Sequence, residues 1–160
     1  RLPEVTLNLI GKSDFILLDS AAGLGREAIS SITAADEILV VTNPDMPSVA
    51  DAFKVINLAK KRNKKIIGVV VNRKKGKWHE LRKEEIEEML SAPILAEIPE
   101  DKNMPMSITV KRPIVNLLPD SPASLEMRKL AHSLCNKEFS YKKPERKYNL
   151  IQKLSRWLVK

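Results

Sequence analysis

The sequence predicts an α/β fold with a partial doubly wound, mostly parallel sheet and flanking helices. Three observations predict it. Apolar runs of strand length alternate with segments of helical periodicity. The connections are short, which favours right-handed crossovers between parallel strands. The first apolar run ends in a carboxylate that small residues follow, as expected at the carboxyl end of a strand in such a sheet.

That first run covers residues 15–18, and its lack of polar residues is typical of a strand covered by helices on both faces. Asp19 follows the run, and Gly23 then leaves room for the backbone to approach a phosphate closely. We therefore interpret residues 14–25 as a Walker B strand followed by a phosphate-sensing loop. From these residues alone, the alternative that Asp19 caps a helix over residues 26–34 stays open.

Strands and helices continue in alternation along the chain. We expect strands over residues 36–42, 64–73 and 92–99, and helices over residues 47–62, 79–90 and 121–137. Pro47 suits the first turn of its helix, and Ser121 suits an N-cap. Residues 100–120 contain three prolines and should form a loop with at most a short helix. Residues 1–11 look like the end of a helix that Gly11 stops.

The chain contains neither G-x-x-x-x-G-K-[ST] nor G-x-G-x-x-G. Without such a loop, the backbone amides and the lysine that cradle nucleotide phosphates are lacking. We therefore expect the chain to begin inside a domain whose N-terminal part, about 100 residues, lies before Arg1.

Four short stretches at expected strand ends point to one family. They are LLDSAAGLG (17–25), TNPD (42–45), VVNR (70–73) and IPED (98–101). Together and in this order, they resemble the MinD branch of the MinD/ParA family of deviant Walker A ATPases, over about residues 12–135. The resemblance implies a P-loop NTPase-like fold, ATP and Mg²⁺ as cofactors, and a homodimer in the ATP-bound state.

The resemblance also implies the site residues. Asp19 would support Mg²⁺, usually through water, and the Gly23 N–H would lie near the γ-phosphate, which gives both a catalytic role. Ala21 stands where family members often have proline. Asn72 would read adenine with its amide, which can both donate and accept hydrogen bonds; without the resemblance, the favoured interpretation is a turn residue that ends a strand. The residues that would flank the base are Arg73, Pro99 and Glu100.

The C-terminal segment is strongly basic. Residues 137–160 hold eight Lys or Arg against two Glu, a net +6 of the chain's +8. We interpret residues 137–146 as a spacer and residues 147–160 as an amphipathic helix that lies on an anionic membrane, although a helix packed on the domain is the alternative. The expected membrane-facing residues are Leu150, Ile151, Lys153, Leu154, Arg156, Trp157 and Leu158.

Taken together, residues 1–136 are interpreted as the C-terminal part of a MinD-like ATPase domain. The resemblance implies a cytoplasmic protein, peripheral on the inner face of the cell membrane, that positions division-site or polar machinery with division regulators of the Min type. We expect no nucleic-acid partner, and no activity from this chain alone because it lacks the P-loop. The alternatives are a flagellar-number regulator, a ParA-type partitioning ATPase, or a non-catalytic adaptor that docks partners on the helix 47–62.

Overall fold

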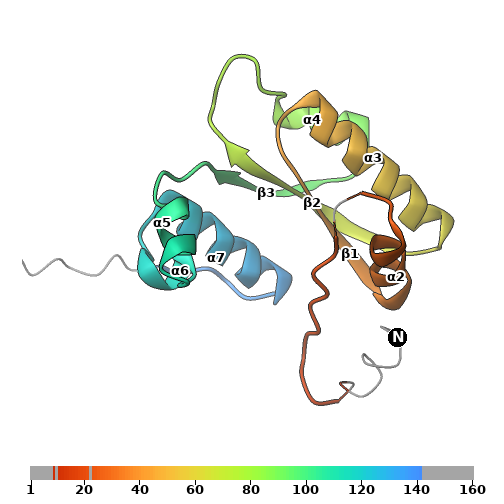
Figure 1. The fold of residues 1–160 in the computed structure, drawn as a ribbon, viewed down its shortest axis with the longest axis horizontal. Coiled ribbons are helices and arrows are strands. Elements are labelled where there is room, and N and C mark those ends of the chain that lie inside the picture. The colour runs from red at the N-terminus through yellow and green to blue at the C-terminus, as the bar shows by residue number, and fades with distance from the viewer. Residues whose placement is uncertain (1–8, 10, 22, 142–160) are drawn as a thin grey trace, which may run out of the picture.

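A computed structural model of the chain describes residues 9, 11–21 and 23–141. Its centre is a three-stranded parallel sheet in the order β1-β2-β3. The strands are β1 (Glu37–Thr42), β2 (Lys65–Lys74) and β3 (Ile94–Pro99). This arrangement confirms the predicted α/β fold, and the three later strands begin and end within two residues of their expected positions (Figure 1).

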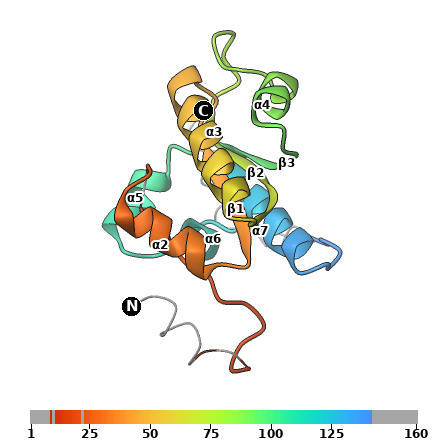
Figure 2. The same cartoon turned by 90° about the vertical axis from the view of Figure 1, so that its right-hand side faces the viewer.

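Helices cover both faces of this sheet. They are α2 (Arg26–Ala34), α3 (Met46–Lys61), α4 (Lys83–Leu90), α5 (Met104–Thr109), α6 (Ile114–Leu117) and α7 (Pro122–Leu134). Helices α3 and α4 lie on one face and α7 on the other (Figures 1 and 2). The starts of α3 and α7 follow from their caps, because the side chains of Asp45 and Ser121 accept hydrogen bonds from the first-turn N–H groups of Ser48 and Ser124.

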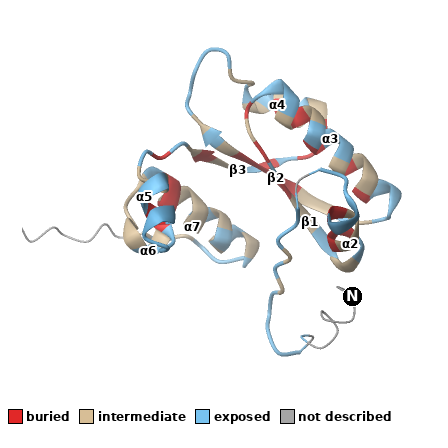
Figure 3. Cartoon of the chain, viewed as in Figure 1, coloured by how far each residue is buried: buried red, intermediate tan, exposed pale blue. Residues whose placement is uncertain are grey.

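Alternating side chains of β2 build the two cores. Val69 and Val71 point to the side of α3 and α4, where they pack with the fully buried Ile56 and Ile86. Val70 points to the other side, toward α7. Figure 3 shows buried residues along β2 and on the helix surfaces next to it. Full burial of each large apolar side chain contributes about 1.5–3 kcal/mol, so these contacts hold the helices on the sheet.

The strand predicted over residues 15–18 is wrong for this structure. These residues have no regular secondary structure, and Phe15 and Leu17 are 58% and 90% exposed. An apolar run becomes a strand only where a neighbouring strand can satisfy its backbone and helices can cover its side chains. Among the described strands, β1 pairs only with β2, so the run has no partner. The helix expected at residues 26–34 is confirmed, with Gly25 rather than Asp19 at its N-cap.

Other boundaries differ in detail. Helix α4 begins at Lys83 rather than at residue 79, and the loop 100–120 contains two short helices instead of at most one. Helix α7 ends at Leu134, three residues early. The helix end expected in residues 1–11 falls largely, and the amphipathic helix over 147–160 entirely, outside the described residues. In the part of the chain that the structure describes, no helix is long and apolar enough to cross a membrane.

Candidate nucleotide site

The candidate site lies at the carboxyl ends of the parallel strands, and a β-bulge in β2 forms its first part. Val71 pairs with Glu97 and Lys74 with Pro99, so β2 has one residue more than β3 between these pairs. Arg73 takes up the extra length with a left-handed φ of 56°. Its N–H donates to Asn72 Oδ1 at 2.9 Å. Bulges redirect side chains next to functional sites, and this one fixes the amide of Asn72.

The end of β3 lies beside this bulge. The Glu100 N–H donates to the Lys74 carbonyl at 2.9 Å, and Lys75 Nζ lies 3.3 Å from Glu100 Oε2. The structure therefore brings together four residues that the sequence predicted for the base pocket. These residues are Asn72, Arg73, Pro99 and Glu100.

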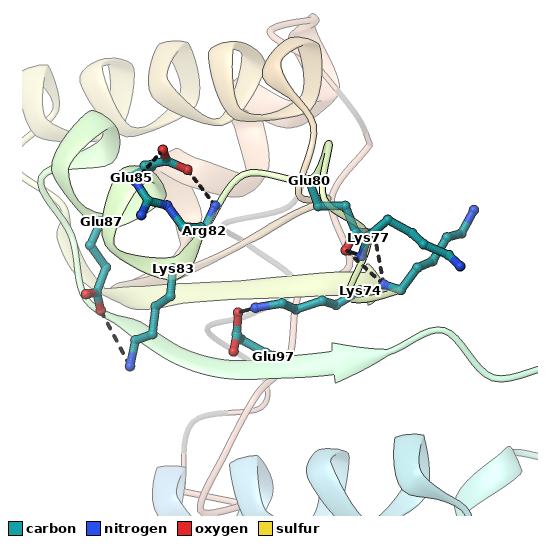
Figure 4. Close-up of polar contacts among 9 residues, drawn as sticks. Lys74, Lys77, Glu80, Arg82, Lys83, Glu85, Glu87 and Glu97 are labelled. Atoms are coloured by element: carbon teal, nitrogen blue, oxygen red, sulfur yellow. Dashed lines mark hydrogen bonds and ion pairs between the residues drawn. The ribbon is translucent and has the colours of Figure 1, made fainter.

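A loop that leaves the bulge is ordered around one carboxylate. The Glu80 side chain accepts hydrogen bonds from the N–H groups of Lys75, at 2.9 and 3.2 Å, and Lys77, at 3.1 Å (Figure 4). Desolvation acts to raise the pKa of Glu80, but the backbone donors of Lys75, Lys77 and Gly76 outweigh it and hold that pKa below 4.5. The Leu81 N–H also donates to the Pro44 carbonyl at 3.0 Å. The loop is thus tied to the end of β1.

Two ion pairs lie next to this loop. Lys74 of β2 pairs with Glu97 of β3, and within α4 Lys83 Nζ lies 3.9 Å from Glu87 Oε1 (Figure 4). Lys74, Lys83 and Glu97 border an open hollow of about 310 Å³. A larger hollow of about 640 Å³ runs along β3 and reaches Pro99. Asn72 lines neither hollow, so neither is the predicted base pocket, and the hollows carry no assignment of the nucleotide.

The two predicted phosphate-side residues lie on the irregular segment before α2. Asp19 is exposed, and Gly23 has a left-handed φ of 80°, which glycine adopts without steric cost. In the described chain, no hydrogen bond joins this segment to β2 or β3. Within the described chain, therefore, no hydrogen bond links Asp19 or Gly23 to the base-side residues.

The residues present fit part of a Mg²⁺–ATP site. Mg²⁺ is usually bound by one or two carboxylates together with water and phosphate oxygens, so a single accessible Asp19 suits it. The described residues include no group of three or more His, Cys, Asp or Glu that could hold a metal ion by itself. At Asn72, the amide nitrogen has no partner within the described chain and can donate to a base. None of the residues that the structure describes belongs to a P-loop that could cradle the phosphates.

Sequence reasoning missed Asp101. This carboxylate directly follows Glu100, is buried, and accepts hydrogen bonds from Asn103. The local pattern Asp-Lys-Asn is a signal for such a turn, because an aspartate side chain readily accepts from the N–H two residues on. Its burial could not be found in the same way, since it depends on where α7 packs.

Comparison with known proteins identifies the family. Residues 8–135 match the ParA family, whose description reads NUBPL iron-transfer P-loop NTPase. The chain belongs to the ParA family of P-loop NTPases. This result confirms the resemblance that the four strand ends indicated.

Individual ParA-family relatives agree with this assignment. The chain is 31% identical over 158 residues to an uncharacterized ATP-binding protein of Methanocaldococcus jannaschii, a match that covers 99% of the chain and 60% of that relative. The fold of this chain is similar to that of the cell division ATPase MinD of Pyrococcus furiosus, with a TM-score of 0.79 and 36% identity. That match covers 84% of this chain and 57% of the Pyrococcus chain.

A second solved structure is similar to the same degree. It is the septum site-determining protein MinD of Pyrococcus horikoshii, complexed with Mg-ADP, with a TM-score of 0.78 and 34% identity. That match covers 83% of this chain and 55% of that one. The chain thus spans about 60% or less of the relatives to which it is compared here.

Proposed function

We propose that this chain forms the base-recognising and metal-side part of a MinD-like ATPase. The observation that supports it best is the bulge at Asn72 and Arg73, which fixes an amide beside the backbone of Pro99 and Glu100. An amide held at a strand end can read the donor and acceptor edge of adenine. Asp19 would support Mg²⁺, and Gly23 would sense the γ-phosphate that a P-loop holds.

In the proposed cycle, two ATP-bound copies dimerise. Each copy carries the basic segment 137–160, so a dimer would bind an anionic membrane multivalently and far more tightly than one copy. Nucleotide state would then control residence on the inner face of the cell membrane. The proposed role is the positioning of division-site or related polar machinery together with regulators of the Min type.

The test uses a form of the protein in which a P-loop segment precedes Arg1. Asn72→Ala should weaken ATP binding and reduce the preference for adenine over guanine nucleotides, because an unmet base edge costs about 1–3 kcal/mol. Asp19→Ala should instead impair the Mg²⁺-dependent hydrolysis of ATP. Titration calorimetry with ATP and GTP, and turnover against Mg²⁺ concentration, measure the two effects.

The control is Asn116→Ala, which removes an exposed amide on α6 and should leave both quantities unchanged. If Asn72→Ala also leaves nucleotide affinity and selectivity unchanged, the adenine assignment is wrong. The 160-residue chain without a P-loop should neither bind ATP with useful affinity nor hydrolyse it. Turnover by that chain that Asp19→Ala abolishes would show that the active site has been misplaced.

A further inference from the structure

Asp101 closes the turn that follows the predicted base-flanking backbone. Its side chain is only 9% exposed. Oδ1 accepts hydrogen bonds from the Asn103 backbone N–H and from Asn103 Nδ2, both at 2.9 Å, and the Met104 N–H donates to the Asp101 carbonyl at 3.0 Å. Residues 101–104 are therefore held in one conformation at the start of α5.

The same carboxylate faces the N-terminus of α7. Ser121, the N-cap of that helix, lies beside it, but the Ser121 hydroxyl donates to Ser124 Oγ at 2.9 Å. A hydroxyl has one hydrogen, so donation to Asp101 would require it to turn away from Ser124. Asp101 Oδ2 is shielded from solvent, and in the described chain it has no hydrogen-bond partner.

Asp101 is charged despite this enclosure. The backbone N–H of Asn103 holds the pKa of Asp101 below its ordinary value against desolvation, with help from the Asn103 side chain and the positive charge of Lys102. An enclosed charge is costly unless donors fix it. The carboxylate therefore has little freedom to move without losing the donors that make its burial tolerable.

We infer that Asp101 is a positioning residue for the base pocket, which fixes the backbone of Pro99 and Glu100 by closing the turn after β3 through the hydrogen bonds that it accepts from the Asn103 N–H and Nδ2. On the opposite side, the Glu100 N–H is held by the Lys74 carbonyl. The base-flanking backbone thus has two attachments, one to β2 and one through Asp101. This inference rests on the proposed function, because it concerns the backbone that would flank the base.

The test again uses the form with a P-loop before Arg1, with ADP, GDP and tripolyphosphate as probes in titration calorimetry. Asp101→Ala should weaken ADP binding about tenfold and lower the preference for ADP over GDP, while tripolyphosphate binding stays unchanged. Asp101→Asn should restore most of the ADP affinity. Its amide oxygen still accepts the hydrogen bonds from the Asn103 N–H and Nδ2.

The control is Glu85→Ala. It removes another carboxylate that accepts a backbone N–H, that of Arg82 at 2.7 Å, and Glu85 is not one of the predicted base-pocket residues. It should leave the ratio of ADP to GDP affinity unchanged. If Asp101→Ala does not fold, Asn103→Ala takes its place, and should weaken ADP binding about threefold without affecting tripolyphosphate.

Two results would overturn the inference. One is wild-type ADP affinity in Asp101→Ala or, if that variant does not fold, in Asn103→Ala. The other is an equal loss of ADP and tripolyphosphate binding in either variant. Both leave the proposed function intact as long as Asn72→Ala still lowers the adenine preference. If Asn72→Ala has no effect either, the base pocket itself is misplaced and the proposed function fails with the inference.

Discussion

The side chain of Leu95 lies directly over the backbone of Gly68. A Cβ at Gly68 would overlap Leu95 Cγ and come within 2.8 Å of Cδ1 and 2.9 Å of Cδ2. Both residues lie at register shifts. Ile38 and Leu39 of β1 pair with Ile66 and Gly68, and Leu95 is the extra residue of β3 between two consecutive pairs with β2. The glycine thus makes room for the irregular strand beside it.

Gly68→Ala should therefore destabilise the chain. Overpacking of this kind lowers the free energy of unfolding by about 1–3 kcal/mol, which urea denaturation followed by circular dichroism measures. In the Gly68→Ala background, Leu95→Ala should recover part of the loss, since it removes the atoms that the new Cβ meets. Gly25→Ala is the control for a Cβ that meets no atom within 4 Å, and it should lose less stability, namely what replacing the N-cap glycine of α2 costs. If Gly68→Ala is as stable as the wild type, the overlap does not exist in solution.

Glu80 should make stability depend on pH. Because backbone donors hold its folded pKa below 4.5, its contribution is present above the unfolded pKa and is lost as the pH falls through the folded pKa. Glu80→Gln should lower the free energy of unfolding by about 1 kcal/mol at pH 7. The difference should shrink below about pH 4. Urea midpoints at pH 7 and pH 3.5 measure it.

Glu88→Gln serves as the comparison for Glu80→Gln. Glu88 is an exposed carboxylate on α4, and its replacement should change the midpoint little at either pH. If Glu80→Gln and Glu88→Gln behave alike, or if the difference at Glu80 grows as the pH falls, the carboxylate does not order the loop.

Residues 147–160 should bind anionic membranes as a helix in the interface. Leu154→Glu or Trp157→Glu places a carboxylate within the apolar face, where desolvation and repulsion from acidic lipid act together. Sedimentation with liposomes of increasing anionic content should show a steep loss of binding. Gln152→Glu, on the opposite face of the predicted helix, should lose much less. A segment that pellets no liposomes even when fused to a dimerising domain would instead be an ordinary packed helix.

The sequence predicted best those elements whose partners lie within the chain. The apolar runs that became β1, β2 and β3 have one another as neighbours and two helix layers as cover. The run over residues 15–18 has the same pattern but no pairing strand among the described residues, and pattern alone cannot reveal the missing neighbour. Local hydrogen bonds also explain why α4 begins at Lys83 and not at residue 79. Glu80 satisfies the loop backbone, and the capping box of Arg82 and Glu85 begins the helix later.

The candidate site likewise has one part that could be predicted from the sequence and another that could not. The nearness of Asn72 and Glu100 was predictable because they lie at the ends of neighbouring strands, and their roles stay a prediction from the family motif. The bulge that aims Asn72 was not predictable, since a bulge depends on the register of two strands that are distant in sequence. Asp101 was missed because its burial arises only when α7 packs against β3.

The free edge of β3, on the side away from β2, affects where a further strand can pair with this sheet. The Ile94 N–H is already occupied by Glu87 Oε1 at 2.8 Å, and Pro93 and Pro99, at the two ends of the strand, have no N–H to offer. The opposite boundary is different, because no described strand pairs with the outer edge of β1, where Val41 is 61% exposed. The edge of β3 therefore offers fewer free backbone N–H groups than the edge of β1, so we expect a further strand to pair with β1 rather than with β3.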